Sequence, residues 1–290
     1  MFAVAARTPR IHAGPVSDAG TTPVGPVGSG FAPAAVNDRS SVGPDAGATH
    51  ATRAPHAAGV SHAAGIPGFF RSFRGLFGSI ATYYGIPFRL MGLRRFYRRF
   101  VSDGSIVFDI GAHVGNRTRV FRSLGARVVA VEPQASCLAI LGRVFGPDAN
   151  IAILPTAIGA AAGTAEMRVS TGSPTLSTLS DQWITQIDTH YGEKNIAWDR
   201  KETVPVETLD RLIQMFGLPD FVKIDVEGFE PEVLKGLTRP VPALSFEYLP
   251  AAVEPAIESL ELVARLGDYE FNYTVRERMG LEMREWTEMD

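Results

Sequence analysis

From Ser105 onward, short runs of apolar and β-branched residues alternate with segments whose apolar residues recur at helical spacing. Most of the helical segments end at or near a glycine, which commonly terminates helices. The expected strands are 105–111, 127–133, 150–159, 220–228 and 243–248, and the expected helices are 116–125, 134–146, 207–217, 231–236 and 252–267. This alternation predicts a doubly wound, mostly parallel α/β sheet with helices on both faces.

Two segments of different composition precede this α/β domain, which we place at residues 105–290. Half of residues 1–68 are Ala, Gly or Pro, a composition that cannot bury enough apolar surface to offset the entropy of folding. We expect a disordered tail there, or a gene start assigned too far upstream. Residues 69–104 are rich in aromatic residues and arginine, and we expect them to form entry helices.

The arginine-rich stretch 89–99 has an amphipathic pattern. Apolar and aromatic side chains form one stripe and arginines the opposite one: Leu90, Leu93, Tyr97 and Phe100 against Arg94, Arg95, Arg98 and Arg99. The stripe of arginines could contact an anionic partner or a membrane surface. Because the whole chain uses 24 Arg against 4 Lys, we favour a packed helix whose arginines are only solvated.

An irregular segment, 171–203, interrupts the alternation. It is too long for an ordinary loop, so we interpret it as a lid or a substrate-recognition insertion. Its aromatic residues Trp183, Tyr191 and Trp198 indicate that it closes over a bound molecule.

Charge and cysteine content narrow the classes of function. The net charge of −3 gives no general attraction to nucleic acid, and we expect no nucleic-acid partner. Cys137 is the single cysteine, which excludes an intrachain disulfide and a cysteine-rich metal site. No uncharged apolar stretch is long enough to span a bilayer, and the first residues lack the order of a secretory signal, so we expect a cytoplasmic protein.

The first strand and the turn after it carry the first binding signal. Asp109 ends the strand, Gly111 and Gly115 lie in the turn, and a helix is expected from about Asn116. Ligands of open α/β sheets bind beyond the carboxyl ends of the strands, which is where this turn lies. Glu132 ends the next strand, and its carboxylate suits the two hydroxyls of a ribose. Together these residues predict a nucleoside-containing cofactor.

The spacing of the glycines favours one such cofactor over another. A dinucleotide pyrophosphate calls for G-x-G-x-x-G without a nearby negative charge, whereas this turn reads GAHVG and follows Asp109. An acidic residue at this place suits the amino group and the sulfonium of S-adenosylmethionine. A nicotinamide-dependent oxidoreductase is the alternative enzyme, and a cofactor-binding or membrane-surface protein without activity is the non-enzymatic one.

Three charged residues alternate in the stretch FVKIDVEGFE, at Lys223, Asp225 and Glu227. A strand covered on both faces cannot leave charges unpaired, so Lys223 is expected to be a buried partner of a carboxylate. We place Asp225 at the reaction centre and Glu227 in the turn that faces the acceptor. Glu247 ends the adjacent strand at the same cleft, and His190 of the insertion could reach it.

Several of these stretches resemble, in order, the motifs of the FkbM family of S-adenosylmethionine-dependent methyltransferases. The similar stretches are FDIGAHVGN, VVAVEP, AIGAAAGTAEM, VPVETLD and FVKIDVEGFEPEVLKG, within residues 106–248. The resemblance implies a class I, Rossmann-like methyltransferase fold. It also implies methyl transfer, usually to a hydroxyl oxygen of a small molecule, a sugar or a glycolipid.

The candidate site combines this resemblance with the residue patterns. We expect cofactor contacts from Asp109, Gly111, Ala112, Gly115, Asn116, Glu132, Pro133, Ala157 and Asp225. The candidate catalytic residues are Asp225, Glu227 and His190, the candidate substrate contacts are Glu227, Glu247 and Trp183, and no metal is assigned.

The end of the chain departs from the family pattern. The family usually continues to another strand, whereas this chain stops at MREWTEMD. We therefore expect a shortened C-terminal sheet edge, with the last strand absent or replaced by GLEMREW (280–286).

Overall fold

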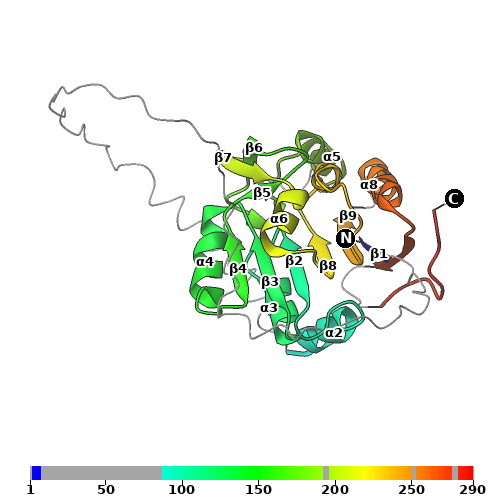
Figure 1. The fold of residues 1–290 in the computed structure, drawn as a ribbon. Coiled ribbons are helices and arrows are strands. Elements are labelled where there is room, and N and C mark those ends of the chain that lie inside the picture. The colour runs from blue at the N-terminus through cyan, green and yellow to red at the C-terminus, as the bar shows by residue number, and fades with distance from the viewer. Residues whose placement is uncertain (1, 8–86, 192–195, 250–252, 276–279, 290) are drawn as a thin grey trace, which may run out of the picture.

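The structure is a computed structural model that describes residues 2–7, 87–191, 196–249, 253–275 and 280–289 (Figure 1). Its main sheet has seven strands in the order β10-β1-β9-β8-β2-β3-β4. These strands are β1 (Phe2–Arg7), β2 (Ile106–Ile110), β3 (Arg127–Val131), β4 (Ile151–Leu154), β8 (Phe221–Ile224), β9 (Ala243–Tyr248) and β10 (Glu270–Val275). The neighbours from β4 to β9 pair in parallel, which confirms the doubly wound α/β fold.

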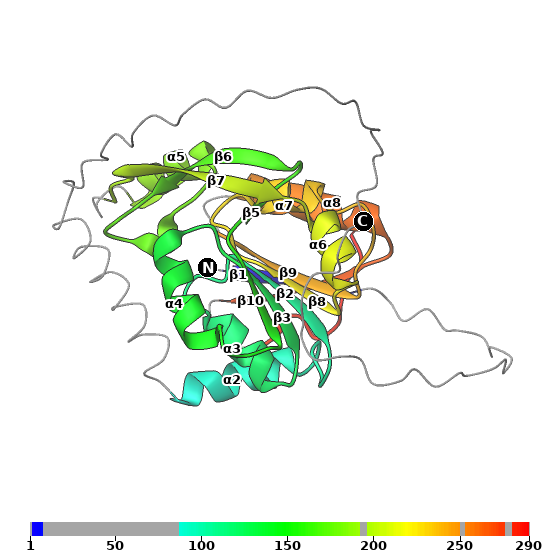
Figure 2. The same ribbon diagram turned by 60° about the vertical axis from the view of Figure 1, so that its left-hand side comes forward.

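Helices cover both faces of this sheet, as Figures 1 and 2 show. One face carries α2 (Pro87–Tyr97), α3 (Asn116–Ser123) and α4 (Ala135–Phe145), and the other carries α6 (Leu209–Phe216), α7 (Glu230–Lys235) and α8 (Val253–Leu266). Alternate residues of each strand supply the two cores: Val107 of β2 packs with the first group of helices, and its neighbour Phe108 packs with the second. Nine of the ten elements predicted from the alternating pattern are present as single elements, and the predicted strand 150–159 is divided into β4 of this sheet and a two-residue strand, Ala157–Ile158, of a second sheet.

Helix α2 confirms the predicted stripe of apolar residues. Of the predicted apolar stripe, Leu93 and Tyr97 are buried and Leu90 and Phe100 are half-buried. Of the predicted arginine stripe, Arg95, Arg98 and Arg99 are exposed and Arg94 is half-buried. The Tyr97 ring meets the rings of Phe121 and Phe221 edge to face. The predicted entry helices before residue 87 lie outside the described residues.

Strand β1 differs from the predicted disordered tail. Residues 2–7 pair antiparallel with both β9 and β10, with Ala3 opposite Glu247 and Thr274. The expectation of a tail without structure is therefore wrong for these six residues, and residues 8–68 lie outside the described residues. A short apolar run is enough for a strand when both of its edges are paired.

The C-terminal edge of the sheet also differs from the prediction. Strand β10 forms this edge and pairs with β1, so the sheet is not shortened there. The stretch 280–286, proposed as a replacement strand, forms no strand, and only Thr287 after it makes an isolated bridge with Phe271.

The insertion 171–203 is ordered rather than irregular in its described residues. It contains a short 3-10 helix, η1 (Pro174–Leu176), the helix α5 (Asp181–Tyr191) and the start of β7 (Arg200–Glu207). Strand β7 lies between β5 (Ala157–Ile158) and β6 (Gly163–Val169) in a second, three-stranded sheet. Figure 2 shows this small sheet and α5 above the carboxyl ends of the main strands. None of the helices in the described ranges is long and apolar enough to cross a membrane.

Candidate active site

A cleft of about 1150 Å³, counting the part open to solvent, lies between the carboxyl ends of the main strands and the small sheet. The ends of β2 and β3, the strand β5, and the turn after β8 all contribute to its wall. The lining includes nine residues that the sequence predicted for the site: Gly111, Ala112, Asn116, Glu132, Pro133, Ala157, Asp225, Glu227 and Glu247. The cleft therefore brings together most of the site predicted from the sequence, at the place where open α/β sheets bind ligands.

Glu132 marks one end of the cleft. It follows β3 directly, and its two carboxylate oxygens accept hydrogen bonds from the backbone N–H groups of His113 and Gln134, each at 2.8 Å. Burial raises the pKa of Glu132 to about 7, although these two hydrogen bonds oppose the rise. Each oxygen keeps a lone pair for a further donor, so the carboxylate is fixed in orientation and can still bind two hydroxyls.

The two glycines of the turn serve the packing of the protein. Both have positive φ, and a Cβ at Gly111 would stand 1.9 Å from the carbonyl oxygen of Asp225. A Cβ at Gly115 would stand 2.2 Å from the Phe145 ring of α4. Gly111 lines the cleft and Gly115 does not, so the predicted cofactor contact of Gly115 is corrected to a packing role. Gly111 lets the turns after β2 and β8 approach each other.

Lys223 is the centre of a buried ionic network. Its Nζ lies 3.2 Å from Asp109 Oδ1 and 3.3 Å from Asp225 Oδ2, and it donates to the carbonyl oxygen of Gly111 at 2.9 Å. The register of the parallel strands places Asp109 directly beside Lys223. The prediction that Lys223 is a buried partner of a carboxylate is confirmed.

Asp109 has a different place from the predicted one. It is fully buried, does not line the cleft, and accepts a hydrogen bond from Thr118 Oγ1 at 2.6 Å. Its predicted contact with the cofactor is therefore corrected. Asp109 pairs with Lys223 inside the protein, and Lys223 in turn pairs with Asp225 at the cleft.

Three carboxyl groups line the opposite end of the cleft, from Asp225, Glu227 and Glu247, and Glu230 borders a smaller cavity that Glu247 also lines. Burial acts to raise the pKa of Asp225, but the Lys223 ammonium and a hydrogen bond with Glu247 lower it overall. Burial and the charge of Asp225 raise the pKa of both Glu227 and Glu247 well above the usual range. The opposite shifts mean that, of the two hydrogen-bonded groups, Asp225 is the one that favours the ionised form and accepts the hydrogen bond, and Glu247 is the one that favours the proton.

Helix α3 brings further polar groups to the cleft. It begins at Asn116 without a side-chain cap, so its first N–H groups have no competing capping oxygen. Arg117 lines the cleft, and its guanidinium lies 6.0 Å from the centre of the Tyr97 ring. His113, in the preceding turn, also lines the cleft, and burial lowers its pKa to about 4. His113 is therefore neutral at pH 7.

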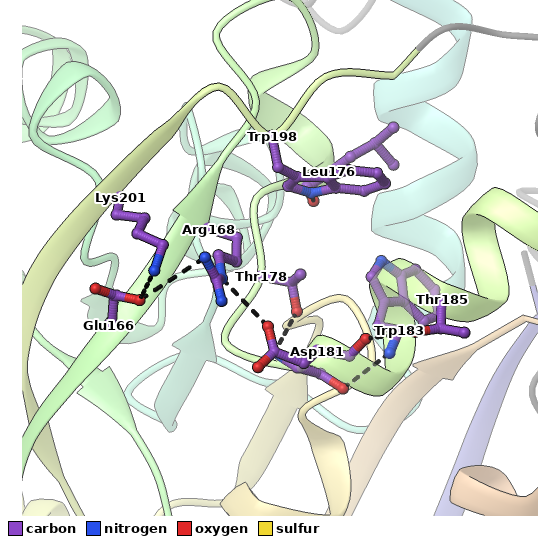
Figure 3. Close-up of polar contacts among 10 residues, drawn as sticks. Glu166, Arg168, Leu176, Thr178, Asp181, Trp183, Thr185, Trp198 and Lys201 are labelled. Carbon is purple, nitrogen blue, oxygen red and sulfur yellow. Dashed lines mark hydrogen bonds and ion pairs between the residues drawn. The ribbon is translucent and has the colours of Figure 1, made fainter.

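The insertion forms one wall of the cleft and holds the turn after β8. Thr178, which lines the cleft, donates from Oγ1 to the carbonyl oxygen of Glu227 at 2.7 Å. The Trp183 side chain of α5 lies against Gly228, where an added Cβ would meet it at 2.7 Å. Figure 3 shows Arg168 and Thr178 near Asp181, the first residue of α5, with an ion pair between Arg168 and Asp181. Glu227 has a φ of 53°, so this contact fixes a backbone conformation that a residue with a side chain rarely adopts.

Of the two predicted residues of the insertion, the structure describes the side chain of Trp183 alone, and this side chain does not line the main cleft. Trp183 is 4% exposed and borders a smaller cavity with Glu230, Glu247 and Leu249, so its predicted substrate contact is corrected to support of the turn. His190 lies near the end of α5, and its side chain is outside the described residues. In the part of the chain that the structure describes, no three His, Cys, Asp or Glu side chains form a group that could hold a metal ion.

Some functional residues have no strong signal in the sequence. Arg117 reaches the cleft because it occupies the first turn of α3, a position that the predicted start of this helix could have indicated. Thr178 reaches it from an insertion whose fold has no clear periodicity. The residue type alone does not indicate a binding role for either Arg117 or Thr178.

The sequence and fold were compared with known proteins. A family model described as the methyltransferase FkbM domain matches residues 109–268, more than half of the chain. The precorrin-6y C5,15-methyltransferase from Geobacter metallireducens GS-15 is 12% identical, over 69% of this chain and 82% of that one, with a TM-score of 0.34. A putative rRNA-methylase from Clostridium thermocellum is 11% identical, over 60% and 62%, with a TM-score of 0.25. The comparison with curated proteins found no match.

Proposed function

Because this chain belongs to the FkbM methyltransferase family, we propose that it transfers the methyl group of S-adenosylmethionine to a hydroxyl oxygen of a small molecule, a sugar or a glycolipid. Membership of the family supports methyl transfer as the reaction, whereas the choice of an oxygen atom as the acceptor is our proposal. The observation that supports it is the position of Asp225 at the cleft, where its pairing with Lys223 and a hydrogen bond with Glu247 lower the pKa of its carboxyl group. The alternative of a nicotinamide-dependent oxidoreductase is set aside.

The residues of the cleft fit S-adenosylmethionine. Glu132 offers two oriented oxygens to the ribose hydroxyls, and the backbone around Ala157 borders the same end, where an adenine ring would lie. The uncapped start of α3 at Asn116 suits the carboxylate of the methionine part. Within the described residues, the buried His113 Nε2 atom has no hydrogen-bond partner, and a polar ligand in the cleft would satisfy it. When bound, the cofactor supplies an electrophilic methyl group.

The residues at the acidic end align the acceptor and take its proton. Of the three carboxyl groups there, Asp225 alone has a lowered pKa and is the one ready to accept a hydrogen bond from an acceptor hydroxyl. Lys223 and Glu247 fix both the charge and the direction of this carboxylate. Alignment of the acceptor is the larger part of such catalysis, and a general base adds about 10² to 10⁴ in rate.

Labelled methyl transfer tests the acceptor atom. The full chain is incubated with S-adenosylmethionine that carries a ¹³C methyl group and with a panel of hydroxylated metabolites, sugars and glycolipid extracts. We expect label in an O–CH₃ group, which NMR distinguishes from N–CH₃ and C–CH₃ groups. The Asp225→Asn variant is the control, and we expect it to lose transfer while it still binds the cofactor. Label on nitrogen or carbon would contradict the proposal.

A further inference from the structure

The two helical layers of the molecule carry opposite charge. Helices α2, α3 and α4 contain seven arginines and no Asp or Glu. Helices α6, α7 and α8, on the other face of the sheet, contain six acidic and three basic residues. Figure 2 shows the two layers on opposite sides of the strands. A chain with a net charge of −3 therefore has one basic side, although Arg117 there lines the cleft and Arg122 pairs with Asp148 after α4.

The outer surface of α2 is an exposed part of this basic side. Met91, Arg95 and Arg98 follow one another at helical spacing, so they point in the same direction. Both arginines are exposed, and Met91 is 67% exposed. Arg99, next to Arg98, is exposed as well, and its guanidinium lies over the Phe96 ring at 5.8 Å. We call Met91, Arg95, Arg98 and Arg99 the α2 patch.

An exposed apolar side chain among arginines suits a lipid surface. Cations near an anionic bilayer are attracted to its headgroups, and a long apolar side chain beside them can enter the boundary of the acyl region. The opposite, acidic layer is repelled by the same headgroups, so the charge distribution selects one orientation of the protein.

The α2 patch is less suited to single-stranded nucleic acid. Such binding combines cations with exposed aromatic rings on which bases stack. Among the side chains that the structure describes on this layer, the rings of Phe96, Tyr97 and Phe121 are buried, and that of Phe100 stacks on Phe221. The aromatic residues of the layer serve the core.

We propose that the α2 patch binds the anionic surface of a lipid bilayer and orients the basic layer toward it. The proposal does not depend on the acceptor atom of the methyl transfer. It assigns a role to the arginine-rich stretch that the reaction leaves unused.

Vesicle flotation of the full chain tests this proposal. The vesicles contain either phosphatidylcholine alone or phosphatidylcholine mixed with phosphatidylserine. We expect the protein to float with the mixed vesicles and not with the neutral ones. Raising the salt from about 0.1 M to about 1 M shortens the screening length from about 10 Å to about 3 Å and should release it.

A charge-reversal variant with a matched control locates the contact. Arg95→Glu/Arg98→Glu should weaken binding to the mixed vesicles at least tenfold, because each arginine near the surface contributes roughly fivefold. Arg239→Glu/Arg265→Glu makes the same change in net charge at exposed sites off this layer, with side chains 52% and 72% exposed. This control should bind like the unaltered chain. Thermal unfolding midpoints confirm that both variants fold.

Three results would overturn the proposal. The first is absence of binding to the mixed vesicles, and the second is an equal loss in both double variants. The third is preferential binding of a single-stranded RNA in a mixture of RNA and vesicles. Met91→Ser should lower the binding that survives at intermediate salt, and an unchanged value would remove Met91 from the patch.

Discussion

Lys223 is the residue on which the geometry of the site depends most. Its ammonium group lies between the buried Asp109 and the half-buried Asp225. Burial acts to lower the pKa of Lys223, but Asp225 and Asp109 raise it. Removal of this cation would leave the fully buried Asp109 carboxylate without its ionic partner.

We expect Lys223→Met to destabilise the fold by about 3 to 5 kcal/mol, the usual cost of breaking a buried ion pair. Urea unfolding measures this change. The second variant, Lys223→Met/Asp109→Asn, should recover part of the loss because it also removes the buried negative charge. Equal stability of the two variants would show that Asp109 and Lys223 are not coupled.

The hydrogen bond between Asp225 and Glu247 predicts a dependence of activity on pH. Glu247 helps to lower the pKa of Asp225, and the ionised Asp225 is the form that accepts a proton. At saturating S-adenosylmethionine, where the titration of Glu132 no longer limits binding, kcat should therefore persist to low pH and fall only when Asp225 becomes protonated. Glu247→Leu removes the donor, so the acid limb of this kcat profile should move up by about one to two pH units. Glu247→Gln keeps a donor, and its profile should stay close to that of the unaltered chain.

Charged residues of the site could be predicted where the sequence gives them an unusual position. Asp225 and Glu132 stand at the ends of apolar strands, where a charge needs a partner or a ligand. Asp109 occupies a similar position, yet it lies below Lys223 instead of at the cleft. The sequence shows that such a charge is compensated, but strand register decides whether a ligand or another side chain compensates it.

At the scale of elements, the insertion supports the turn after β8, which carries Asp225 and Glu227. Thr178 holds the carbonyl group of Glu227, and Trp183 packs on Gly228. The same threonine pairs through its backbone with Arg168 of β6, which joins the turn to the small sheet. The insertion thus fixes the end of the cleft at which we propose that the methyl acceptor binds.

Thr178→Val removes the donor to Glu227 with little change in volume. Because a hydrogen bond contributes about 0.5 to 1.5 kcal/mol, we expect kcat to fall roughly two- to tenfold while the affinity for S-adenosylmethionine is unchanged. Thr178→Ser should restore kcat. Thr185→Val removes a comparable hydroxyl from the exposed face of α5 and should leave kcat unaffected. Equal losses of kcat and cofactor affinity in Thr178→Val would indicate general damage to the fold.

The elements that the sequence pattern did not predict, such as β7 and α5, were missed for a common physical reason. Strand β7 (RKETVPVE) carries charges on its exposed positions, and α5 (DQWITQIDTHY) is rich in residues with weak helix propensity. Both are stabilised by tertiary contacts, such as the pairing of β7 with β6 and the packing of Ile187 with Leu249. By contrast, strands buried on both faces, such as β2 and β3, have an unbroken apolar run that identifies them directly.

Strand β1 gives a test of the sheet order. Val4 lies opposite Phe246 of β9 and Tyr273 of β10, so its backbone is enclosed on both sides. Val4→Pro removes one N–H from this ladder and should lower the unfolding midpoint measurably. Val4→Ala keeps the N–H and should have a smaller effect. If Val4→Pro is no more destabilising than Val4→Ala, β1 is not part of the sheet.

At the scale of the whole molecule, the parallel sheet brings distant residues to one cleft. Glu132, Asp225 and Glu247 come from three strands, and each follows or ends its strand at the same edge of the sheet. The cofactor end and the acidic end of the cleft are therefore fixed by the order of the strands. The insertion and the small sheet then close the space above them.

Binding calorimetry of the full chain tests the central claim, that Glu132 and this cleft hold S-adenosylmethionine. We expect binding of S-adenosylmethionine and of its demethylated product, but not of NAD. Affinity should fall as the pH drops below about 7, because the pKa of Glu132 is about 7 and only its ionised form accepts both ribose hydroxyls. Glu132→Ala should weaken binding by about 1.5 to 3 kcal/mol and abolish this pH dependence. Binding of NAD alone, or an unchanged affinity in Glu132→Ala, would contradict the account.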